Sequence, residues 1–347
     1  MLGKIILQNG TQFIGNAYGA LKSSSGEVVF ATGMTGYPQA FTDPSFAGQI
    51  LVMTYPLLGN YGVPDASLWE SKKVQIAGLV VSQYIDTPSH YQSKMTLSQW
   101  LKKVKIPLLE IKDTRFLTEH LREKGVMLGK IVVDKDVDQY DPNAENIVAN
   151  VSVKEVENHI IARKNKTVVM LDCGAKENIV RCFLNRGVNV IRVPWDFDPF
   201  ANKVKFDALF ISNGPGDPKK VDKTITTIQK ALDAKIPTLG ICLGNQLLAL
   251  AAGGDTYKLK YGHRSQNQPC LQVKTNRCYI TTQNHGFAIG DVPKGFSPWF
   301  VNANDKSIEG IIHDKHPFMS VQFHPEATPG PMDTEWIFDY FLERITK

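Results

Sequence analysis

A cysteine flanked by two glycines is the residue of this chain best placed to do covalent chemistry. Cys242 follows residues 236–241, an apolar stretch that favours a buried strand, and precedes residues 245–252, which favour a helix. A nucleophile on such a strand-to-helix turn has strained backbone geometry and needs small neighbours two positions away, which Gly240 and Gly244 supply. The helix N-terminus would also favour the thiolate. A buried structural cysteine is the alternative interpretation, and the presence of a base decides between the two.

A base for this thiol is found far downstream, in the sequence His324-Pro325-Glu326, directly after the strand-like residues 318–323. Residues two apart on an extended chain point the same way, so Glu326 can hold the imidazole of His324 in one tautomer and stabilise its cation. Nε2 of His324 would then take the proton of the thiol. A histidine at a strand end is more often structural, but its combination with Cys242 favours a Cys-His-Glu triad.

A glycine-rich loop supplies a third part of the predicted site. Residues 212–218, Ser-Asn-Gly-Pro-Gly-Asp-Pro, follow an apolar strand at 207–212, and Gly214 and Gly216 leave backbone N–H groups uncovered. Such donors, together with the N–H of Leu243, can stabilise a developing oxyanion. The competing interpretation, a phosphate-binding loop, fails because the Gly-Lys-Ser/Thr ending is absent and no Gly-x-Gly-x-x-Gly opens a helix elsewhere.

These motifs resemble those of the triad-type, class I glutamine amidotransferases. They are Gly240-Ile-Cys-Leu-Gly-Asn-Gln246, Ser212-Asn-Gly-Pro-Gly-Asp-Pro218 and Gln322-Phe-His-Pro-Glu-Ala327. Four further motifs narrow the resemblance to the small, glutamine-hydrolysing subunit of carbamoyl-phosphate synthase: Gly33-Met-Thr-Gly-Tyr37, Thr42-Asp-Pro-Ser-Phe46, Thr281-Thr-Gln-Asn-His-Gly-Phe287 and Pro325-Glu-Ala-Thr-Pro-Gly-Pro331 followed by Asp333. The resemblance covers essentially the whole chain.

The resemblance implies a role for each matching residue. Cys242 would form the thioester, and His324 and Glu326 would complete the triad. Glutamine would be held mainly by backbone and amide groups, which suits a zwitterionic substrate that needs both donors and acceptors. The implied glutamine contacts are Ser45, Gly214, Gly216, Leu243, Gln246, Asn284, Gly286 and Phe287.

Two departures from the family pattern are visible. Asn245 stands where relatives usually carry His, and Ser265 and Gln266 stand where relatives commonly carry Gly-Gly. Neither departure touches the triad. They concern the position of the helix that follows Cys242 and the flexibility of a loop that we expect to face the site or a partner.

The resemblance also implies a partner. This chain has no recognisable nucleotide-binding loop, so we expect no cofactor and no metal in it, and ATP and Mg²⁺ on a large synthetase subunit that uses bicarbonate. Glutamine plus water would give glutamate plus ammonia, and the ammonia would pass to that subunit, in a heterodimer or a higher oligomer of heterodimers. The carbamoyl phosphate would serve arginine or pyrimidine biosynthesis.

Three alternatives remain open. The chain could be the glutaminase subunit of another amidotransferase, or a stand-alone cysteine hydrolase acting on γ-glutamyl compounds, which would need no ATP-using partner. It could also be a non-catalytic partner-binding module with a degenerate site. The complete set of Cys242, His324 and Glu326 speaks against the last of these.

Composition agrees with a cytoplasmic enzyme. The 347 residues suit two domains, and a hydrophobic content of 43% is enough for real cores. The net charge of +5 is spread among 34 acidic residues with no basic run, so nucleic-acid binding is not indicated. Five cysteines at irregular spacing argue against disulfides and show no zinc-like pairing. The first apolar residues are too few for a signal peptide, and no stretch reads as a membrane span.

The pattern of elements changes near the middle of the chain, which predicts an α/β protein of two domains. Residues 1–150 read as short strands separated by turns, with a helix at 113–123, and predict a mixed α+β domain that docks the partner and forms one wall of the glutamine pocket. Residues 151–166 are charged and predict a linker. In 167–347, strands at 167–172, 189–193, 207–212 and 237–241 alternate with helical segments, which predicts an open parallel-sheet amidotransferase domain ending in an amphipathic helix at 333–346.

Overall fold

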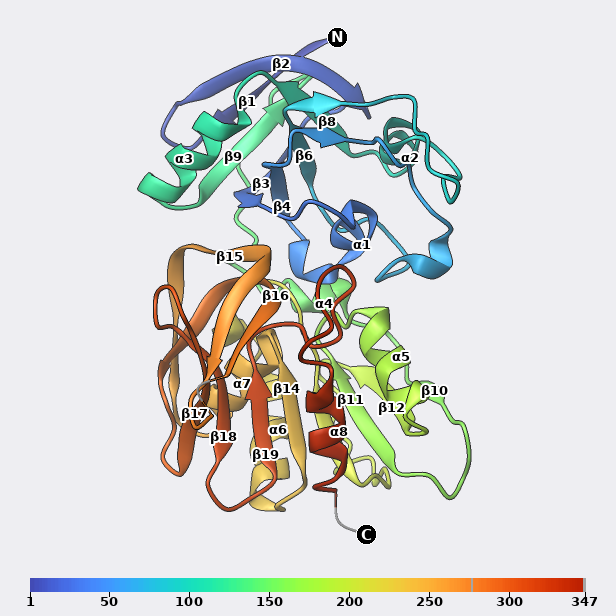
Figure 1. The fold of residues 1–347 in the computed structure, drawn as a ribbon, viewed down its shortest axis with the longest axis vertical. Coiled ribbons are helices and arrows are strands. Elements are labelled where there is room, and N and C mark those ends of the chain that lie inside the picture. Colours follow the sequence, from blue (N-terminus) through green and yellow to red (C-terminus); the bar gives the residue numbers. More distant parts are fainter. Residues whose placement is uncertain (276, 346–347) are drawn as a thin grey trace. The chain divides into compact units, whose positions relative to one another are not determined.

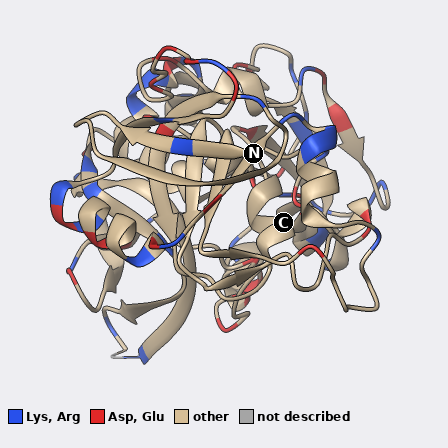
Figure 2. Cartoon of the chain, turned by 90° about the horizontal axis from the view of Figure 1, so that it is seen from above, with Lys and Arg blue, Asp and Glu red and all other residues tan. Residues whose placement is uncertain are grey.

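The computed structural model describes residues 1–275 and 277–345, and the chain divides into two compact units, Met1–Glu145 and Asn146–Lys347 (Figure 1). Lys and Arg are interspersed with Asp and Glu along the ribbon (Figure 2). Within the described residues, no helix has the length and apolar character needed to cross a membrane.

The first unit is built on a closed barrel of seven strands. In barrel order these are β1 (Leu2–Leu7), β2 (Gln12–Gly19), β8 (Pro107–Ile111), β6 (Gly78–Val81), β4 (Gln49–Met53), β3 (Ser24–Ala31) and β9 (Met127–Val132). Every residue of β4 is buried, because Ile50 and Val52 belong to one apolar cluster and Leu51 and Met53 to another. The sequence of a strand that is covered on both faces is a nearly continuous run of apolar residues.

Two helices cover this barrel. Helix α3 (Thr114–Lys124) starts at Asp113, whose side chain accepts a hydrogen bond from Phe116 N–H, and its Leu117 and Leu121 pack into the cluster of Ile50 and Val52. Helix α2 (Leu97–Lys103) has a complete capping box and packs against the other cluster. The remaining elements of the unit are short: α1 (Tyr37–Thr42), η1 (Pro44–Phe46), η2 (Ala66–Leu68), β5 (Leu57–Leu58) and β7 (Gln83–Tyr84).

The second unit contains one ten-stranded sheet, whose parallel half matches the sequence prediction. Its parallel strands, in order, are β12 (Asn189–Pro194), β11 (Thr167–Asp172), β13 (Ala208–Ile211), β14 (Thr238–Ile241) and β19 (Phe318–Val321). Helices α5 (Glu177–Asn185) and α8 (Trp336–Leu342) share one core cluster with the sheet, while α6 (Asp222–Asp233) and α7 (Leu243–Ala251) share another. Helices therefore cover both faces, as parallel strands require.

The other half of this sheet is antiparallel and was not predicted. It continues from β19 through β18 (Ile308–His313), β16 (Arg277–Asp291), β15 (Asp255–Gln272) and β17 (Phe296–Asn302). Strands β15 and β16 carry buried polar side chains such as Arg264 and Gln283, which break the apolar alternation by which a strand is normally read. Strand β16 also carries three of the implied glutamine contacts, Asn284, Gly286 and Phe287.

Two expected segments have a different detailed structure. The region expected as a linker, residues 151–166, begins at the last residue of α4 (Val148–Val151) and contains β10 (Glu157–His159), which pairs with β12 at the edge of the sheet. The expected terminal helix at 333–346 is wrong at its start, because residues 334–335 form turns with hydrogen bonds three residues apart and α8 begins at Trp336. Thr346 lies outside the described residues.

Candidate active site

Cys242 has the backbone geometry expected of a nucleophile elbow. It lies between β14 and α7 with φ 55° and ψ −104°, a region that non-glycine residues rarely occupy. Its N–H donates to the carbonyl of Val321 at 2.8 Å, which fixes the turn against β19. A Cβ on Gly240 would lie 2.4 Å from the carbonyl oxygen of Gly244, and one on Gly244 would lie 2.2 Å from that of Ile211. The glycines are therefore required by packing as well as by the turn.

His324 and Glu326 form the expected pair. Nδ1 of His324 lies 2.7 Å from Oε1 of Glu326, and both side chains are buried. Burial alone would lower the pKa of His324, but the charge of Glu326, followed by the nearby Cys242 thiol, raises it to about 10. Among the described residues, Nε2 of His324 makes no hydrogen bond of regular geometry, so it is available for proton transfer. Nε2 of His324 is therefore placed to take the Cys242 proton, and Glu326 is placed to stabilise the resulting imidazolium.

A lysine that sequence analysis did not identify completes this group. Nζ of Lys176 lies 3.0 Å from Oε1 of Glu326 and also donates to the carbonyl of Ala327, and its side chain is only 2% exposed. Burial alone would raise the pKa of Glu326, but Lys176 and His324 together lower it to about 2. The carboxylate therefore stays ionised and able to stabilise the imidazolium.

The turn after the triad is held by side chains of the segment that carries this lysine. Nδ2 of Asn178 donates to the carbonyl of Glu326 at 2.6 Å and to Oγ1 of Thr328 at 2.8 Å. Ala327 and Thr328 both have positive φ, 55° and 50°. Such geometry persists only where its surroundings impose it, so Lys176 and Asn178 help to set the position of the carboxylate.

The glycine-rich loop lies against the elbow. A Cβ on Gly214 would meet the carbonyl oxygen of Cys173 at 2.0 Å and a side-chain carbon of Leu243 at 2.9 Å. Gly216 has φ 85°, a conformation that favours glycine. Leu243 is the first residue of α7, so its N–H is one of those that the helix itself cannot pair. The loop and the helix start can thus supply donors to the same oxyanion.

Four further implied glutamine contacts lie on β16 and the first turns of α7, and one of them contacts the cysteine. The carbonyl oxygen of Asn284 lies 3.7 Å from Sγ of Cys242 as a hydrogen-bond acceptor. Nε2 of Gln246 donates to the carbonyl of Phe287 at 2.8 Å, which ties α7 to β16. Gly286 lies between these two, and a Cβ there would come within 3.2 Å of the guanidinium of Arg264. The backbone of β16 therefore lines the nucleophile.

Ser45 belongs to the first unit. It is buried in η1, and its N–H donates to Oδ1 of Asp43 at 2.9 Å, so its backbone is fixed within its own turn. Its contact with glutamine stays a prediction that the resemblance implies.

The two departures from the family pattern have clear structural settings. Nδ2 of Asn245 donates to Oε1 of Gln322 at 3.0 Å, and Oδ1 of Asn245 accepts from Ser320 at 2.8 Å, so this side chain joins α7 to the chain around β19. Ser265 and Gln266 lie within β15. The expectation of a loop at these two positions is wrong: both belong to a strand, in which Ser265 is paired with Gln283 and the ladder has a register shift between Ser265 and Gln268.

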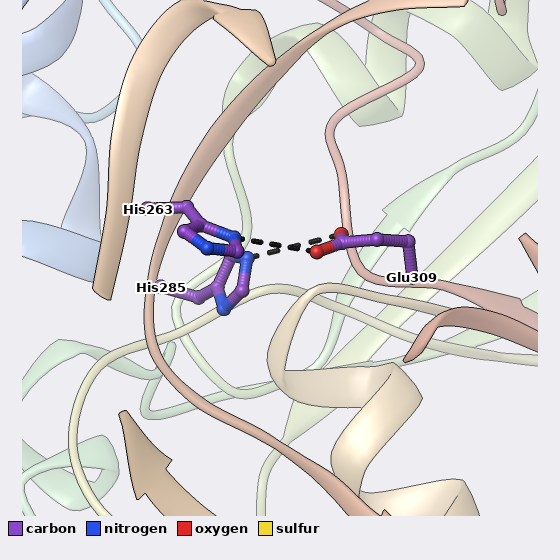
Figure 3. Close-up of side chains that lie close together, drawn as sticks. All are labelled: His263, His285 and Glu309. Atoms are coloured by element: carbon purple, nitrogen blue, oxygen red, sulfur yellow. Dashed lines mark ion pairs between the residues drawn. The ribbon is translucent and has the colours of Figure 1, made fainter. Parts of the chain in front are cut away.

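Sequence analysis also missed a group of potential metal ligands. Within the described part of the chain, His263, His285 and Glu309 place ligand atoms within 4.8 Å of one another, and all three are buried (Figure 3). They come from three different strands, so no local spacing could have revealed them.

Family comparisons agree with this geometry. The family model "Glutamine amidotransferase class-I" matches residues 169–344, and the model "Carbamoyl-phosphate synthase small chain, CPSase domain" matches residues 5–131. The chain belongs to the class I glutamine amidotransferase family, and its first unit is similar to the carbamoyl-phosphate synthase small-chain domain.

Three relatives illustrate the similarity. The chain is 46% identical to the multifunctional protein URA2 of Saccharomyces cerevisiae, over 98% of this chain and 17% of that protein. It is 48% identical to the multifunctional protein CAD of Squalus acanthias, over 99% and 16% respectively. It is 43% identical to the mitochondrial carbamoyl-phosphate synthase [ammonia] of Homo sapiens, over 99% and 24%. The chain thus spans a quarter or less of the length of these relatives.

Proposed function

We propose that this chain is the glutamine-hydrolysing component of a carbamoyl-phosphate synthase. The observation that carries the proposal is Cys242 on a positive-φ elbow, in the same unit as a buried His324–Glu326 pair whose hydrogen bond is 2.7 Å long. The tandem match to a small-chain domain and an amidotransferase domain supports the choice of this synthase over other glutamine-dependent enzymes.

Acylation begins with the thiolate of Cys242, whose proton is held by Nε2 of His324. Sulfur attacks the side-chain carboxamide carbon of glutamine, and the electron pair of the C=O bond moves onto oxygen. The N–H groups of Leu243 and the 214–216 loop stabilise this oxyanion. As the tetrahedral intermediate collapses, His324 gives its proton to the nitrogen, the C–N bond breaks, and ammonia leaves a γ-glutamyl thioester.

Deacylation uses the same groups in reverse. Neutral His324 takes a proton from water, and the oxygen attacks the thioester carbon. The C–S bond then breaks, which releases glutamate and restores the thiolate–imidazolium pair. Glu326, kept ionised by Lys176, stabilises the imidazolium in both halves of the reaction and does not itself transfer a proton.

We further propose that ammonia passes to a large synthetase subunit or domain, which supplies ATP, Mg²⁺ and bicarbonate chemistry. Ammonia that escaped would be largely protonated at neutral pH and lose its nucleophilicity, which favours a protected transfer. The similarity of the first unit to the small-chain domain supports its assignment to partner docking. The five free thiols suit a reducing compartment, consistent with a cytoplasmic enzyme.

The test compares Cys242→Ser with Cys278→Ser, a control at the exposed cysteine. Glutamate release from glutamine is measured for each chain, alone and mixed with a synthetase subunit, together with carbamoyl phosphate formation from glutamine or from ammonium. We expect Cys242→Ser to lose both glutamine-dependent reactions while ammonium still supports synthesis, and Cys278→Ser to resemble the wild type.

Two outcomes would contradict the proposal. Near wild-type glutaminase turnover in Cys242→Ser would remove that residue from the chemistry. Wild-type chain that hydrolyses glutamine at full rate but never supports glutamine-dependent synthesis would favour the stand-alone hydrolase.

A further inference from the structure

The cluster of His263, His285 and Glu309 lies in the antiparallel half of the sheet. His263 on β15 and His285 on β16 are directly opposite each other in the ladder, and Glu309 lies on β18. Nδ1 of His263 lies 3.3 Å from Oε1 of Glu309, and Nε2 of His285 lies 3.9 Å from its Oε2. Figure 3 shows both imidazoles directed towards the carboxylate. None of these residues takes part in the proposed glutaminase chemistry.

Two of the ligand atoms have no hydrogen-bond partner among the described residues. These are Nδ1 of His263 and Oε2 of Glu309, and both are buried. The 3.3 Å approach between His263 and Glu309 does not have hydrogen-bond geometry. Leaving a buried polar atom unpaired costs about 1–3 kcal/mol, and more for a charged group. A bound cation would therefore give both of these atoms a partner.

The hydrogen-bond partners of the third ligand, His285, also indicate a bound cation. Its Nδ1 lies 2.9 Å from the carbonyl of Phe287, and its Nε2 lies 3.1 Å from Oε1 of Gln283. Both neighbours are oxygen acceptors, yet a neutral imidazole has one N–H to donate. The carbonyl can only accept, so it takes the Nδ1 proton, and the lone pair of Nε2 then faces the oxygen of Gln283. A positive centre between these atoms would satisfy both.

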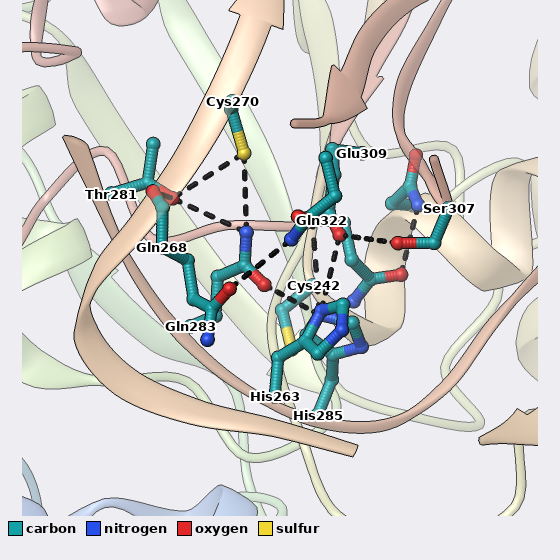
Figure 4. Close-up of polar contacts among 12 residues, drawn as sticks. Cys242, His263, Gln268, Cys270, Thr281, Gln283, His285, Ser307, Glu309 and Gln322 are labelled. Carbon is teal, nitrogen blue, oxygen red and sulfur yellow. Dashed lines mark hydrogen bonds and ion pairs between the residues drawn. The ribbon is translucent and has the colours of Figure 1, made fainter. Parts of the chain in front are cut away.

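The orientation of the Gln283 amide supports this assignment. Its Nε2 lies 3.2 Å from Oγ1 of Thr281 and 3.2 Å from Sγ of Cys270. Thr281 donates its own hydroxyl proton to the carbonyl of Gln268, so its oxygen is left to accept from the amide nitrogen. Figure 4 shows these contacts, with the amide oxygen directed towards the histidines. Gln283 thus offers its amide oxygen as a fourth ligand.

An outer layer of hydrogen bonds orients each ligand. Nε2 of His263 lies 2.8 Å from Oδ2 of Asp305, and Ser307 donates to Oε1 of Glu309 at 3.0 Å. His285 is fixed by the Phe287 carbonyl. Metal-bound histidines characteristically direct their second ring nitrogen to a carboxylate or a backbone carbonyl, and this support fixes the tautomer. Both histidines here have that support.

We propose that His263 Nδ1, His285 Nε2, Glu309 and Gln283 Oε1 form a binding site for a divalent transition metal ion of the Zn²⁺ class. Two imidazole nitrogens and two oxygens suit such an ion better than Mg²⁺ or Ca²⁺, which prefer oxygen ligands alone. A tetrahedral ion with bonds of about 2.0–2.1 Å spaces its ligands roughly 3.3 Å apart. The observed 3.3 and 3.9 Å are close to that spacing.

The ion would stabilise the strand that lines the nucleophile. His285 lies between Asn284, whose carbonyl accepts from the Cys242 thiol, and Gly286. The Phe287 carbonyl accepts from both His285 and Gln246. Fixing His285 therefore fixes the β16 backbone at the elbow. The role is structural, and metal binding does not depend on whether the chain is a glutaminase.

The test uses Co²⁺ as a spectroscopic probe and the full chain after removal of bound metal. Thiols compete for such ions, so the titration is done in a Cys242→Ala, Cys278→Ala background. We expect one equivalent of Co²⁺ per chain, visible d–d absorption, and an X-ray absorption spectrum with imidazole and oxygen ligands but no sulfur.

Variants locate the bound ion. Glu309→Gln and His263→Asn remove direct ligands and should weaken Co²⁺ binding by about 100-fold or more, because loss of an outer partner alone costs roughly 10–100-fold. Asp305→Asn removes only such an outer partner and should lie in that 10–100-fold range. His313→Asn, on the same strand as Glu309 and outside the cluster, is the matched control and should bind Co²⁺ normally.

Thermal unfolding supplies a second measurement that does not rely on variant affinity. Wild-type chain should melt at a higher temperature with Zn²⁺ or Co²⁺ than without, because an ion that binds only the folded state stabilises it. Absence of stoichiometric binding to wild-type protein, or an absorption spectrum with sulfur ligands, would overturn the proposal. So would full Co²⁺ affinity in folded Glu309→Gln. In each of these cases the cluster does not bind the ion.

Discussion

Nζ of Lys176 lies 3.0 Å from Oε1 of Glu326, and both side chains are shielded from solvent. The same oxygen lies 2.7 Å from Nδ1 of His324, so one carboxylate serves a lysine and a histidine at once. The lysine keeps Glu326 ionised, and the ionised carboxylate favours the imidazolium. The orienting group of the triad therefore depends on a cation from a different element, the turn that follows β11.

Lys176→Met should reduce glutaminase kcat/KM by about 10²-fold, within the range of a lost acid–base contribution. Removing the cation raises the pKa of Glu326, so the acid limb of the pH–rate profile should move to higher pH. Lysine acts here as a positioning residue, and that shift is the measurement that a purely structural role would not produce. An unchanged profile in a folded Lys176→Met chain would remove Lys176 from the mechanism.

The same variant should lose stability, because breaking a buried ion pair costs about 3–5 kcal/mol. Glu326 keeps His324 as a partner, which places the expected loss near 3 kcal/mol. Lys219→Met is the matched control: Lys219 pairs with Asp255 at 2.6 Å on the surface, where 48% and 55% of the two side chains are exposed. Exposed pairs contribute little to stability, because water and salt screen the two charges. Urea unfolding should therefore show a much larger loss in the free energy of unfolding for Lys176→Met than for Lys219→Met.

Acid stability should depend on Glu326. Its pKa falls from 4.5 to about 2 on folding, so its contribution to the free energy of unfolding is present above pH 4.5. It is lost as pH falls from about 4.5 to about 2, where the folded state must also take up the proton. Unfolding free energies of wild type and Glu326→Gln should therefore converge in that window. Parallel curves from pH 6 to pH 2 would contradict the assignment.

Alkaline stability should depend on His324, with the opposite sign. Its pKa rises from 6.5 to about 10 on folding, so its stabilising contribution is fully present below pH 6.5 and disappears as pH rises to about 10. Wild type should lose stability relative to His324→Asn across that range. In a Cys242→Ala background, the pH range over which this stability is lost should be narrower, because the Cys242 thiol is one of the groups that raise the pKa of His324. An NMR titration of His324 would measure this shift directly.

Much of the second unit follows from its sequence because its signals are local. The four strands predicted at 167–241 agree with the structure to within a residue or so, because each is a short apolar run bounded by turns. The elbow was predictable because Gly240 and Gly244 bracket Cys242 within five residues. His324 and Glu326 were predictable as a pair because a two-residue spacing fixes their relative direction.

The parts that were missed are long-range contacts. Lys176 meets Glu326 across 150 positions, and a lone lysine near a strand end carries no local sign of burial. His263, His285 and Glu309 meet only when three strands pair in register. The antiparallel strands that hold them contain buried polar residues, which hide the alternation of apolar residues that identifies a strand. Sequence patterns therefore located the three residues of the triad, but neither Lys176 nor the buried cluster on β15, β16 and β18.

The two loop glycines should respond differently to substitution, which separates folding from oxyanion stabilisation. A Cβ on Gly214 would lie 2.0 Å from the carbonyl oxygen of Cys173, so Gly214→Ala must displace backbone and should mainly lower the melting temperature.

Gly216 has φ 85° and is constrained by its conformation. Gly216→Val should turn the loop N–H groups away from the oxyanion and cost on the order of 10² in kcat/KM, as when one oxyanion donor is lost. Steady-state kinetics and melting curves of both variants provide the comparison. Normal kinetics in folded Gly216→Val would show that the loop does not contact the reacting carbonyl, and would leave Leu243 N–H as the principal donor.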